Sequence, residues 1–492
     1  MDKDSTVKIT KNLLRLERGE NELLLVNCLN PRPLYIKKGR QYISDFLKSA
    51  SELGSYNRII NHYPDDVNLL ELLLTHEIII PAGSEKENIP YRKLSETLVL
   101  KNRRNTSLYL LLSQSCNMGC VYCLNGIKTY RKEKNLMMSR DVAFQSIDRC
   151  LADIRPGGFL EVIFFGGEPM LNWPLAKEII TCCENSLKAK HHERQIKYHF
   201  TSNLSIIPDD LNAWAKKYNI TFLCDIDGPE PVHNNCRPFK GGRPSYGPIV
   251  SNIRRLVDDG LKVSLRATIT ALNEDYLAQI AGHHRAIGGS SCAFVPVNPV
   301  NSDEDILSEE MLPSPDKIIE GLIKVYSDRI WRPEDLYPFN QYWSRFARGS
   351  RMAVGCGAPY GNTPVVDING DVYPCIYLVG IQKFYMGNMM NGTYPDEGLL
   401  DWMYDLLHVD RTAECKSCPW RYLCGGGCPV GRLTVLSNSS AGKEVTAYCE
   451  QIRCEYTRKL MESVLWDKAR ETASGILERY SEDETMDTTI HC

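Results

Sequence analysis

The sequence lacks three features that would mark other classes of protein. It has no apolar run near the ~20 residues needed to cross a bilayer, and its first residues lack the basic and apolar regions of a secretory signal. Its charge is almost balanced, with 58 Lys and Arg against 61 Asp and Glu and a formal net charge of -3. We therefore expect a cytoplasmic protein with no nucleic-acid and no membrane partner.

The composition is that of a folded, water-soluble chain. Of the 492 residues, 43% are hydrophobic and 24% are charged, which excludes disordered and collagen-like classes. This length allows roughly two to four domains, each with its own core.

Cysteine is abundant, with 19 residues, and the spacing of these residues is more informative than their number. A reducing cytoplasm disfavours disulfides, so the thiols should be metal ligands, catalytic groups or small buried residues. Three of them, Cys116, Cys120 and Cys123, form a C-x3-C-x2-C run. Seven more lie in the last third of the chain and are Cys356, Cys375, Cys415, Cys418, Cys424, Cys428 and Cys449. The other nine are expected to pack in the core.

The C-x3-C-x2-C run favours an iron-sulfur cluster over zinc. Three thiolates on one loop can hold three irons of a 4Fe-4S cubane and leave the fourth iron open for a ligand. A structural zinc site takes four ligands, and no neighbouring His or Cys completes this set. An open iron suits catalysis better than electron storage, so this run is the first candidate site.

Apolar, β-rich segments alternate with helical patterns through the middle of the chain. Strands are expected at 107–113, 160–165, 196–201, 219–225, 261–270 and 291–297. Helices are expected between them near 139–154, 172–188, 207–218, 246–259 and 273–286. This βαβα order predicts an α/β fold whose parallel strands form an incomplete (β/α)6 barrel related to the TIM barrel.

Residues suited to chemistry follow the ends of these strands, where parallel barrels build their active sites. Glycines after the second strand let the backbone approach a ligand, and Glu168 offers a carboxylate for an ammonium group. Together with the cysteine run, these residues predict a site for a zwitterionic ligand beside a cluster. The residues concerned are Gly166, Gly167, Glu168, Pro169, Ser202, Asn203, Asp225 and Arg266.

These motifs resemble those of the radical S-adenosylmethionine superfamily. The three cysteines, with Tyr122 before the last of them, match its signature, and Gly166 to Pro169 match its methionine-amine motif. The resemblance implies that the open iron of one catalytic 4Fe-4S cluster binds the amine and carboxylate of S-adenosylmethionine. An electron from the cluster would then cleave the sulfonium bond, and the 5'-deoxyadenosyl radical would abstract a hydrogen atom.

A further motif is similar to one in the peptide-modifying branch of that superfamily. The stretch Asp227-Gly228-Pro229 is followed by His233 and Arg237, and Arg237 is thereby expected among the cofactor-binding residues. Asn234 stands where the branch usually has Asp, so no role is assigned to that position.

The cysteines of the last third resemble the SPASM domain, which carries auxiliary iron-sulfur clusters in enzymes that modify peptides or proteins. The spacing is C-x13-G-x4-C, then C-x2-C-x5-C-x3-C, then a last cysteine. On spacing alone, a zinc ribbon is the alternative. Carried over by position, the resemblance assigns Cys356, Cys375 and Cys428 to a first auxiliary 4Fe-4S cluster, and Cys415, Cys418, Cys424 and Cys449 to a second.

Seven ligands are one short of the eight that two complete cubanes need. Either Cys454 or another residue supplies the eighth ligand, or one iron of the first auxiliary cluster is open. An open iron could bind a substrate thiolate, since thiolates are natural iron ligands and binding lowers their pKa.

Residues 1–90 are expected to form an α+β module of winged-helix size. Short strands at 11–17, 22–28 and 33–37 precede helical patterns from about 39 to 75. The module resembles the PqqD-like peptide-recognition element of enzymes that modify ribosomally made peptides, which binds a leader peptide at a sheet edge. A structural cap or a dimerisation domain is the alternative.

The predicted organisation follows from these assignments. It comprises the recognition module at 1–90, a linker at 91–103, the radical S-adenosylmethionine barrel at 104–320, a bridging region at 321–350, and the SPASM domain with a C-terminal helix at 351–492.

The leading functional hypothesis is that the enzyme crosslinks a ribosomally synthesised precursor peptide, with a thioether as the leading bond type. A leader-bearing precursor and a flavodoxin or ferredoxin-type reductant are its expected partners. Carbon-carbon or carbon-oxygen crosslinking and epimerisation are alternatives within the family. A non-catalytic iron-sulfur or zinc scaffold is an alternative from another class.

Formylglycine formation by an anaerobic sulfatase maturase is the nearest competing hypothesis. That family has an Asp proton acceptor directly after the cysteine of its G-x4-C motif. Here Cys375 is followed by Ile376 and Tyr377, which counts against that activity. No general base can be named from the sequence.

Overall fold

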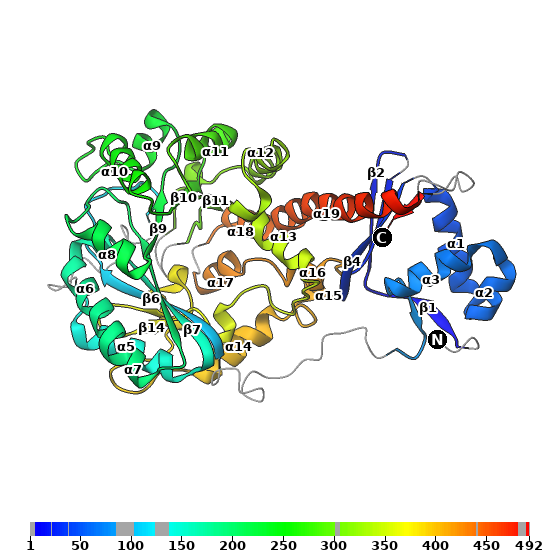
Figure 1. Cartoon of the computed structure of the whole chain (residues 1–492), viewed down its shortest axis with the longest axis horizontal. Helices are drawn as coiled ribbons and strands as arrows, with labels where there is room; N and C mark the ends of the chain where they lie inside the picture. The colour runs from blue at the N-terminus through cyan, green and yellow to red at the C-terminus, as the bar shows by residue number, and fades with distance from the viewer. Residues whose placement is uncertain are drawn as a thin grey trace.

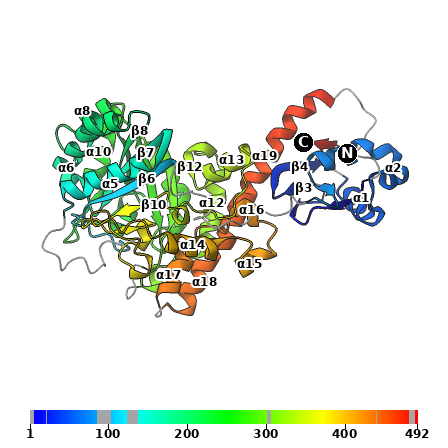
Figure 2. The ribbon, with the colours of Figure 1, turned by 90° about the horizontal axis from the view of Figure 1, so that it is seen from below.

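Three hydrogen-bonded sheets organise the chain in the computed structural model, which describes residues 5–20, 22–37, 39–84, 103–123, 137–300, 306–438, 441–480 and 489–491. Figures 1 and 2 show a larger body and a smaller N-terminal body, with the helix α19 (Thr457–Tyr480) reaching from one to the other. The predicted linker at 91–103 lies outside the described residues except for Arg103. Within the described ranges, no helix is long and apolar enough to cross a membrane.

The largest sheet has nine strands, of which six neighbouring ones are parallel and follow one another in chain order. Each of the six overlaps a predicted strand, so the predicted α/β fold with a parallel (β/α)6 core is confirmed. The six are β6 (Arg103–Ser113), β7 (Ile154–Gly166), β8 (Gln195–Thr201), β9 (Thr221–Asp225), β10 (Val263–Ile269) and β11 (Ser291–Pro296).

Helices connect these strands and cover their outer face (Figure 1). The helix predicted at 172–188 is present, but it changes to a π-helical turn after Cys182 and ends in α7 (Lys188–Lys190). A short helix, α9 (Glu230–Cys236), was not predicted and follows β9. The remaining connecting helices are α5 (Arg140–Ala152), α6 (Trp173–Cys182), α8 (Leu211–Tyr218), α10 (Tyr246–Asp258) and α11 (Leu277–Ala286).

The strand β10 shows how the two-residue period of a strand builds the site. Val263, Leu265 and Ile269 alternate along it and are buried in apolar cores. The residues between them point to the other face of the sheet, so Arg266 and Thr268 line a cavity there. A single strand thereby contributes to the hydrophobic core and to the candidate site.

The cysteine-rich region extends the barrel sheet directly. β13 (Val365–Val366) pairs in parallel with β6, and β14 (Val372–Tyr373) pairs antiparallel with β13. At the other edge, β12 (Leu336–Tyr337) pairs in parallel with β11. Because β6 leads into the loop that contains Cys116, this pairing brings the cysteine-rich region beside that loop.

Short helices make up most of the remaining C-terminal region. They are α12 (Pro315–Ser327), α13 (Phe339–Ala347), α14 (Glu397–Leu407), α15 (Ala413–Lys416), α16 (Arg421–Cys424), α17 (Val430–Ser437) and α18 (Lys443–Gln451).

The N-terminal body contains an antiparallel meander and a small helical layer. Its strands are β2 (Leu13–Arg18), β3 (Glu22–Asn27) and β4 (Asn30–Lys37), and its helices are α1 (Arg40–Leu53), α2 (Tyr56–His62) and α3 (Val67–Thr75). β1 (Val7–Ile9) and β5 (Ile79–Pro81) form a separate two-stranded sheet. The C-terminal strand β15 (Thr489–His491) pairs antiparallel with β4.

The meander is buried on both faces. Leu23 and Leu25 of β3 pack in one core with Phe46 of α1. Leu24, which points to the opposite face, packs in a second core with Trp466 of α19. The N-terminal body is therefore docked on the C-terminal region through an apolar contact.

Candidate active site

A cavity lies at the carboxyl ends of the parallel strands, where the barrel predicts an active site. The structure brings most of the predicted site residues to this cavity, and several unpredicted ones join them. Its predicted lining residues are Cys116, Cys120, Cys123, Gly166, Gly167, Ser202, Asn203, Asp225, Arg237 and Arg266. The unpredicted ones include Met118, Thr268, Asn298, Ile376 and Tyr377.

Glycine is required where β7 reaches the cysteine loop. Gly166 has a φ of 125°, and a Cβ there would overlap the carbonyl oxygen of Ser113. A Cβ on Gly167 would overlap the carbonyl oxygen of Ser115. The Gly167 N–H donates a hydrogen bond to Ser113 O at 2.6 Å, so the strand end and the cysteine loop are held together.

Glu168 is buried and hydrogen-bonded to residues that line the cavity. Its carboxylate accepts hydrogen bonds from the Ser202 hydroxyl at 2.7 Å, the Asn203 N–H at 2.8 Å and the Met170 N–H at 3.0 Å. Burial raises the pKa of this carboxyl group, while these donors lower it. Since both oxygens already have partners, Glu168 joins β7 to β8, and its predicted contact with an ammonium group stays a prediction.

A buried ionic network crosses the floor of the cavity. Arg266 binds both carboxylate oxygens of Asp225, at 2.6 and 3.0 Å, and Arg237 lies 3.5 Å from the same carboxylate. Burial raises the pKa of Asp225, but the two arginines outweigh it and lower the pKa to about 2. Asp225 is therefore ionised at neutral pH.

Tyr122, the aromatic residue of the cysteine run, is also held by this network. Its hydroxyl donates to Asp227 at 2.5 Å and accepts from Arg237 at 2.7 Å. Burial raises the pKa of Asp227 to about 6, although Arg237 opposes this shift. The motif that follows β9 thus fixes the orientation of the cysteine loop.

The other residues of that motif are structural. His233 is buried and accepts from the Asp227 N–H at 3.3 Å, and burial and Arg237 lower its pKa to about 3. Asn234 accepts from the backbone N–H groups of Ser245 and Tyr246 at 2.9 and 3.0 Å, where α10 begins. This explains why Asn suits the position at which no role was assigned.

Two buried polar atoms of the lining have no hydrogen-bond partner among the described residues. They are Nε of Arg237 and Oδ1 of Asn298. Buried polar groups are normally paired, so a donor and an acceptor left open beside three reduced cysteines indicate a polar ligand. These residues fit a cluster together with a zwitterionic cofactor.

The predicted first auxiliary set lies next to this cavity. Burial raises the pKa of the Tyr377 phenol; the thiols of Cys375 and Cys428 add to this shift, and Arg266 opposes it. Cys356 is in turn a neighbour of Cys428. The sequence indicated Tyr377 only as a departure from the maturase motif; its position at the cavity depends on the pairing of β13 with β6.

Single-metal sites find no support in the described ranges. No three His, Cys, Asp or Glu side chains there converge as ligands of one ion. A zinc ribbon needs four ligands around one ion, whereas a cubane distributes its thiolates over several irons. The geometry of the described residues therefore does not support the zinc alternative.

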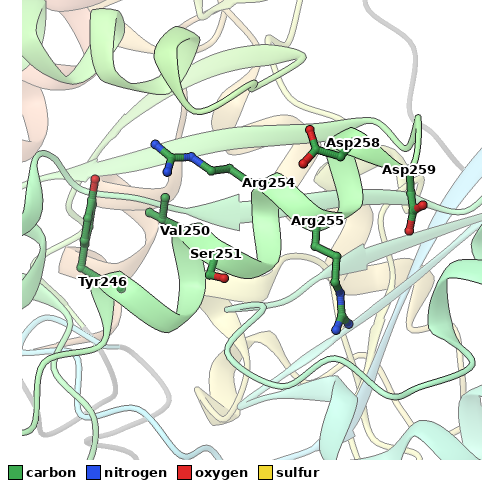
Figure 3. A pocket seen from close by; sticks show the side chains of 8 residues that line it. Tyr246, Val250, Ser251, Arg254, Arg255, Asp258 and Asp259 are labelled. Atoms are coloured by element: carbon green, nitrogen blue, oxygen red, sulfur yellow. The ribbon is translucent and has the colours of Figure 1, made fainter.

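A second and more open hollow lies along α10. Figure 3 shows its lining, which includes Tyr246, Arg254, Arg255 and Asp258. It contains no cysteine and shares no lining residue with the rim cavity. Its charged residues Arg254, Arg255 and Asp258 lie on an exposed helix surface, so we place the candidate site at the rim.

The radical SAM superfamily model matches residues 110–283, which span the barrel from β6 to α11. This range contains the cysteine run, the glycines and the ionic network. Residues 110–283 therefore match the radical SAM superfamily, whose members are enzymes. Members of this superfamily use S-adenosylmethionine and a 4Fe-4S cluster, which agrees with the open polar atoms and thiols at the rim.

Two curated proteins are similar to this chain in sequence. The serine-type anaerobic sulfatase-maturating enzyme of Bacteroides thetaiotaomicron is 24% identical over 369 residues, covering 66% of this chain and 83% of that enzyme. The radical SAM cyclopropyl synthase TigE of Paramaledivibacter caminithermalis is 25% identical over 180 residues, covering 35% of this chain and 36% of that enzyme.

A solved structure shares the fold. Native anSMEcpe with bound AdoMet and the Kp18Cys peptide superimposes with a TM-score of 0.60 at 20% identity. The match covers 75% of this chain and 99% of that chain.

Proposed function

We propose that this radical SAM enzyme crosslinks a ribosomally made precursor peptide, by a thioether from a cysteine sulfur to a carbon of another residue. One observation carries the proposal: Tyr377 lines the cavity of the catalytic cysteines and is also a neighbour of Cys375 and Cys428. A peptide at the cavity mouth would therefore lie between two groups of thiolates.

The residues of the rim have separate tasks in this proposal. When S-adenosylmethionine and the catalytic cluster are bound, they supply radical abstraction of a hydrogen atom from the substrate. The open Nε of Arg237 and Oδ1 of Asn298 would bind the polar ends of the cofactor. Arg266 keeps Asp225 ionised, and Gly166 and Gly167 let the end of β7 pack closely on the cysteine loop.

The auxiliary cysteines support oxidative crosslinking, because forming a thioether releases electrons that clusters can accept. Cys356, Cys375 and Cys428 would hold the cluster nearer to the substrate. A reductant of the flavodoxin or ferredoxin type would supply the first electron.

The N-terminal body supports a role in peptide recognition. Its antiparallel meander ends in β4, and the pairing of β15 with β4 shows that this edge accepts an added antiparallel strand. A leader peptide would bind by the same main-chain hydrogen bonds, either at β2 or in place of β15.

Formylglycine formation is the second candidate, favoured by the name of the Bacteroides relative. Ile376 argues against it, since this residue follows Cys375 directly and its apolar side chain lines the cavity. An aliphatic side chain has no atom that accepts a proton.

Co-expression with a candidate precursor peptide tests the proposal. Loss of two hydrogens, together with one cysteine that resists alkylation, is expected for a thioether. Formylglycine, formed from Ser or from Cys, is an aldehyde, so a product that reacts with a hydrazide probe would favour the second candidate. Loss of two hydrogens with every cysteine alkylated and no such aldehyde would favour a carbon-carbon or carbon-oxygen crosslink. The matched control replaces Cys116, Cys120 and Cys123 by Ala and should give unmodified peptide.

A separate assay addresses the non-catalytic scaffold. The reconstituted and reduced enzyme should release 5'-deoxyadenosine from S-adenosylmethionine. Absence of this product from a preparation with a full complement of iron would reject the catalytic proposal.

A further inference from the structure

Three cysteines of the predicted second auxiliary set share one apolar core. Cys415 is buried there, and Cys418 and Cys424 pack against the same core. Cys28 of the N-terminal body belongs to it as well. Two cysteines that follow these three in the chain, Cys449 and Cys454, are candidates for the fourth thiol; Cys28, an electrostatic neighbour of Cys418 and Cys424, precedes the barrel and is fully buried.

Cys449 lies in a different core. It is buried on α18 with Val300, Val445 and Tyr448. Its sulfur faces the backbone of Gly431, where a Cβ would come within 2.9 Å of Sγ. Burial raises the pKa of Cys449 to about 12, and Glu450 adds to this; no other thiol in the described part of the chain contributes. Cys449 therefore packs in a different core from the other three thiols, although Ile452 contacts both cores.

Cys454 lies on the π-helical turn Ile452–Tyr456, between α18 and α19. Wider turns of this kind re-aim side chains and are frequent at functional sites. The backbone before it packs closely on the triple glycine, because a Cβ on Gly427 would overlap the carbonyl oxygen of Arg453. The glycines between Cys424 and Cys428 thus permit this approach.

Arg453 joins the turn to the three thiols. Its Nη1 donates to the carbonyl oxygen of Gly426 at 3.4 Å and lies 4.0 Å from Sγ of Cys415. The Gly426 N–H donates to Sγ of Cys424 at 3.2 Å. The side chain of Arg453 is 3% exposed and also pairs with Glu450, so its position is fixed by several contacts.

The electrostatic neighbours agree with this geometry. Burial raises the pKa of Cys424 to about 12, and the thiols of Cys418, Cys415 and Cys454 raise it further. Burial also raises the pKa of Cys415; Arg453 opposes it, and Cys454 and Cys418 add to it. Cys454 is thus an electrostatic neighbour of both Cys424 and Cys415, which agrees with the contacts of Arg453.

We infer that Cys454, and not Cys449, completes a four-thiol set with Cys415, Cys418 and Cys424 that holds the second auxiliary iron-sulfur cluster. The inference rests on the proposed function only in taking these cysteines as cluster ligands. Arg453 supplies a buried positive charge beside this set, which offsets the negative charge of four thiolates.

This assignment specifies the first set as well. With Cys454 in the second set and Cys449 apart, the first set keeps three thiols, those of Cys356, Cys375 and Cys428. A cubane on three thiolates has one open iron, and the cavity beside Tyr377 is where a substrate cysteine could reach it.

Metal content tests the inference without turnover. In a background that replaces Cys116, Cys120 and Cys123 by Ala, the full chain is reconstituted anaerobically and its iron, sulfide and electron paramagnetic resonance spectrum are measured. Cys454→Ser is expected to lose one cluster, about four irons per chain, whereas Cys449→Ser is expected to keep both. A Cys375→Ser variant identifies the signal of the first cluster.

The outcomes are distinct. Loss of iron in Cys449→Ser but not in Cys454→Ser would overturn the inference, as would equal loss in both or disappearance of the first cluster's signal in Cys454→Ser. Circular dichroism of each variant establishes that the chain is folded. A failure of peptide crosslinking would leave these iron counts unchanged, so the two proposals fail separately.

Alkylation of the unmutated protein gives a second measurement. Iodoacetamide followed by peptide mass spectrometry is expected to modify Cys454 in the apoprotein and to leave it unmodified in the reconstituted holoenzyme. Equal modification of Cys454 in both forms would contradict the inference, even if the serine variants fold poorly.

Discussion

The guanidinium of Arg237 donates a hydrogen bond to the hydroxyl of Tyr122 at 2.7 Å, although 115 residues separate the two in the chain. The bond connects the loop that carries the catalytic cysteines to the motif that follows β9. It also places a buried cation beside Asp225 and Asp227, the two carboxylates of the rim. The orientation of the cysteine loop therefore depends on the folding of the barrel as a whole.

Replacing Arg237 by Met should weaken the binding of S-adenosylmethionine by about tenfold to a hundredfold. A hydrogen bond to a charged group contributes about 1.5–3 kcal/mol, and the Nε of Arg237 is open toward a ligand. Isothermal titration of the reconstituted enzyme measures this change. Arg243, which is exposed, provides the matched Arg243→Met control; equal weakening in both variants would contradict the prediction.

Replacing Gly166 by Ala should destabilise the fold far more than replacing Gly157. Both glycines have a positive φ, which costs an L-residue about 1–2 kcal/mol. A Cβ added at Gly157 would have no atom within 4 Å, whereas a Cβ at Gly166 would overlap Ser113 O. Urea unfolding of the two apoproteins gives the difference. Similar losses would show that backbone strain alone requires glycine at position 166.

Acid should weaken the fold through Asp225 in a defined range of pH. Its pKa is lowered to about 2 in the folded chain, so its contribution to stability is present above the unfolded value of about 4 and is lost as the pH falls from 4 toward 2. The shift corresponds to about 2–3 kcal/mol. Unfolding of the apoprotein by urea across this range measures it.

The Asp225→Asn variant provides the control for that pH dependence. It should be less stable at pH 7, because Arg266 and Arg237 lose a buried anion. It should also lose less stability than the unmutated protein between pH 4 and pH 2. Parallel curves for the two proteins would exclude Asp225 as the titrating group.

Replacing Tyr377 by Phe should separate cofactor cleavage from peptide modification. Tyr377 lines the cavity, and the substitution keeps its ring and removes its hydroxyl, so 5'-deoxyadenosine formation should continue while crosslinked peptide falls by about tenfold or more. Liquid chromatography with mass spectrometry quantifies both products. Tyr385→Phe, outside the cavity lining, should change neither; an equal fall of both products in Tyr377→Phe would instead indicate a role in cofactor binding.

The barrel and its rim could be predicted from the sequence because local pattern decides them. Apolar runs gave the six parallel strands, and the direction of parallel strands placed Cys116, Gly166 and Asp225 at one end. The start of β7 was predicted six residues too late, at 160 instead of Ile154, because Arg155-Pro156-Gly157-Gly158 has no apolar pattern. Its pairing with β6 across a register shift extends the strand.

Other parts of the site depend on contacts between distant segments. Tyr377 and Asn298 reach the cavity through the pairing of β13 with β6 and through the loop after β11, which no local pattern specifies. Three donors bind the carboxylate of Glu168, which no local pattern indicated, so its predicted contact with an ammonium group stays a prediction. Spacing alone could not distinguish Cys449 from Cys454 as a ligand. Cys449 lies on α18 and Cys454 on the π-helical turn that follows it, and the sequence does not indicate this turn.

The pairing of β15 with β4 has a practical consequence for handling this enzyme. An affinity tag fused after residue 492 would begin within a few residues of a strand that occupies a sheet edge of the N-terminal body. Such a tag would lie close to the surface on which leader binding is measured. Affinities should therefore be compared between amino-terminal and carboxy-terminal fusions, and after proteolytic removal of each tag.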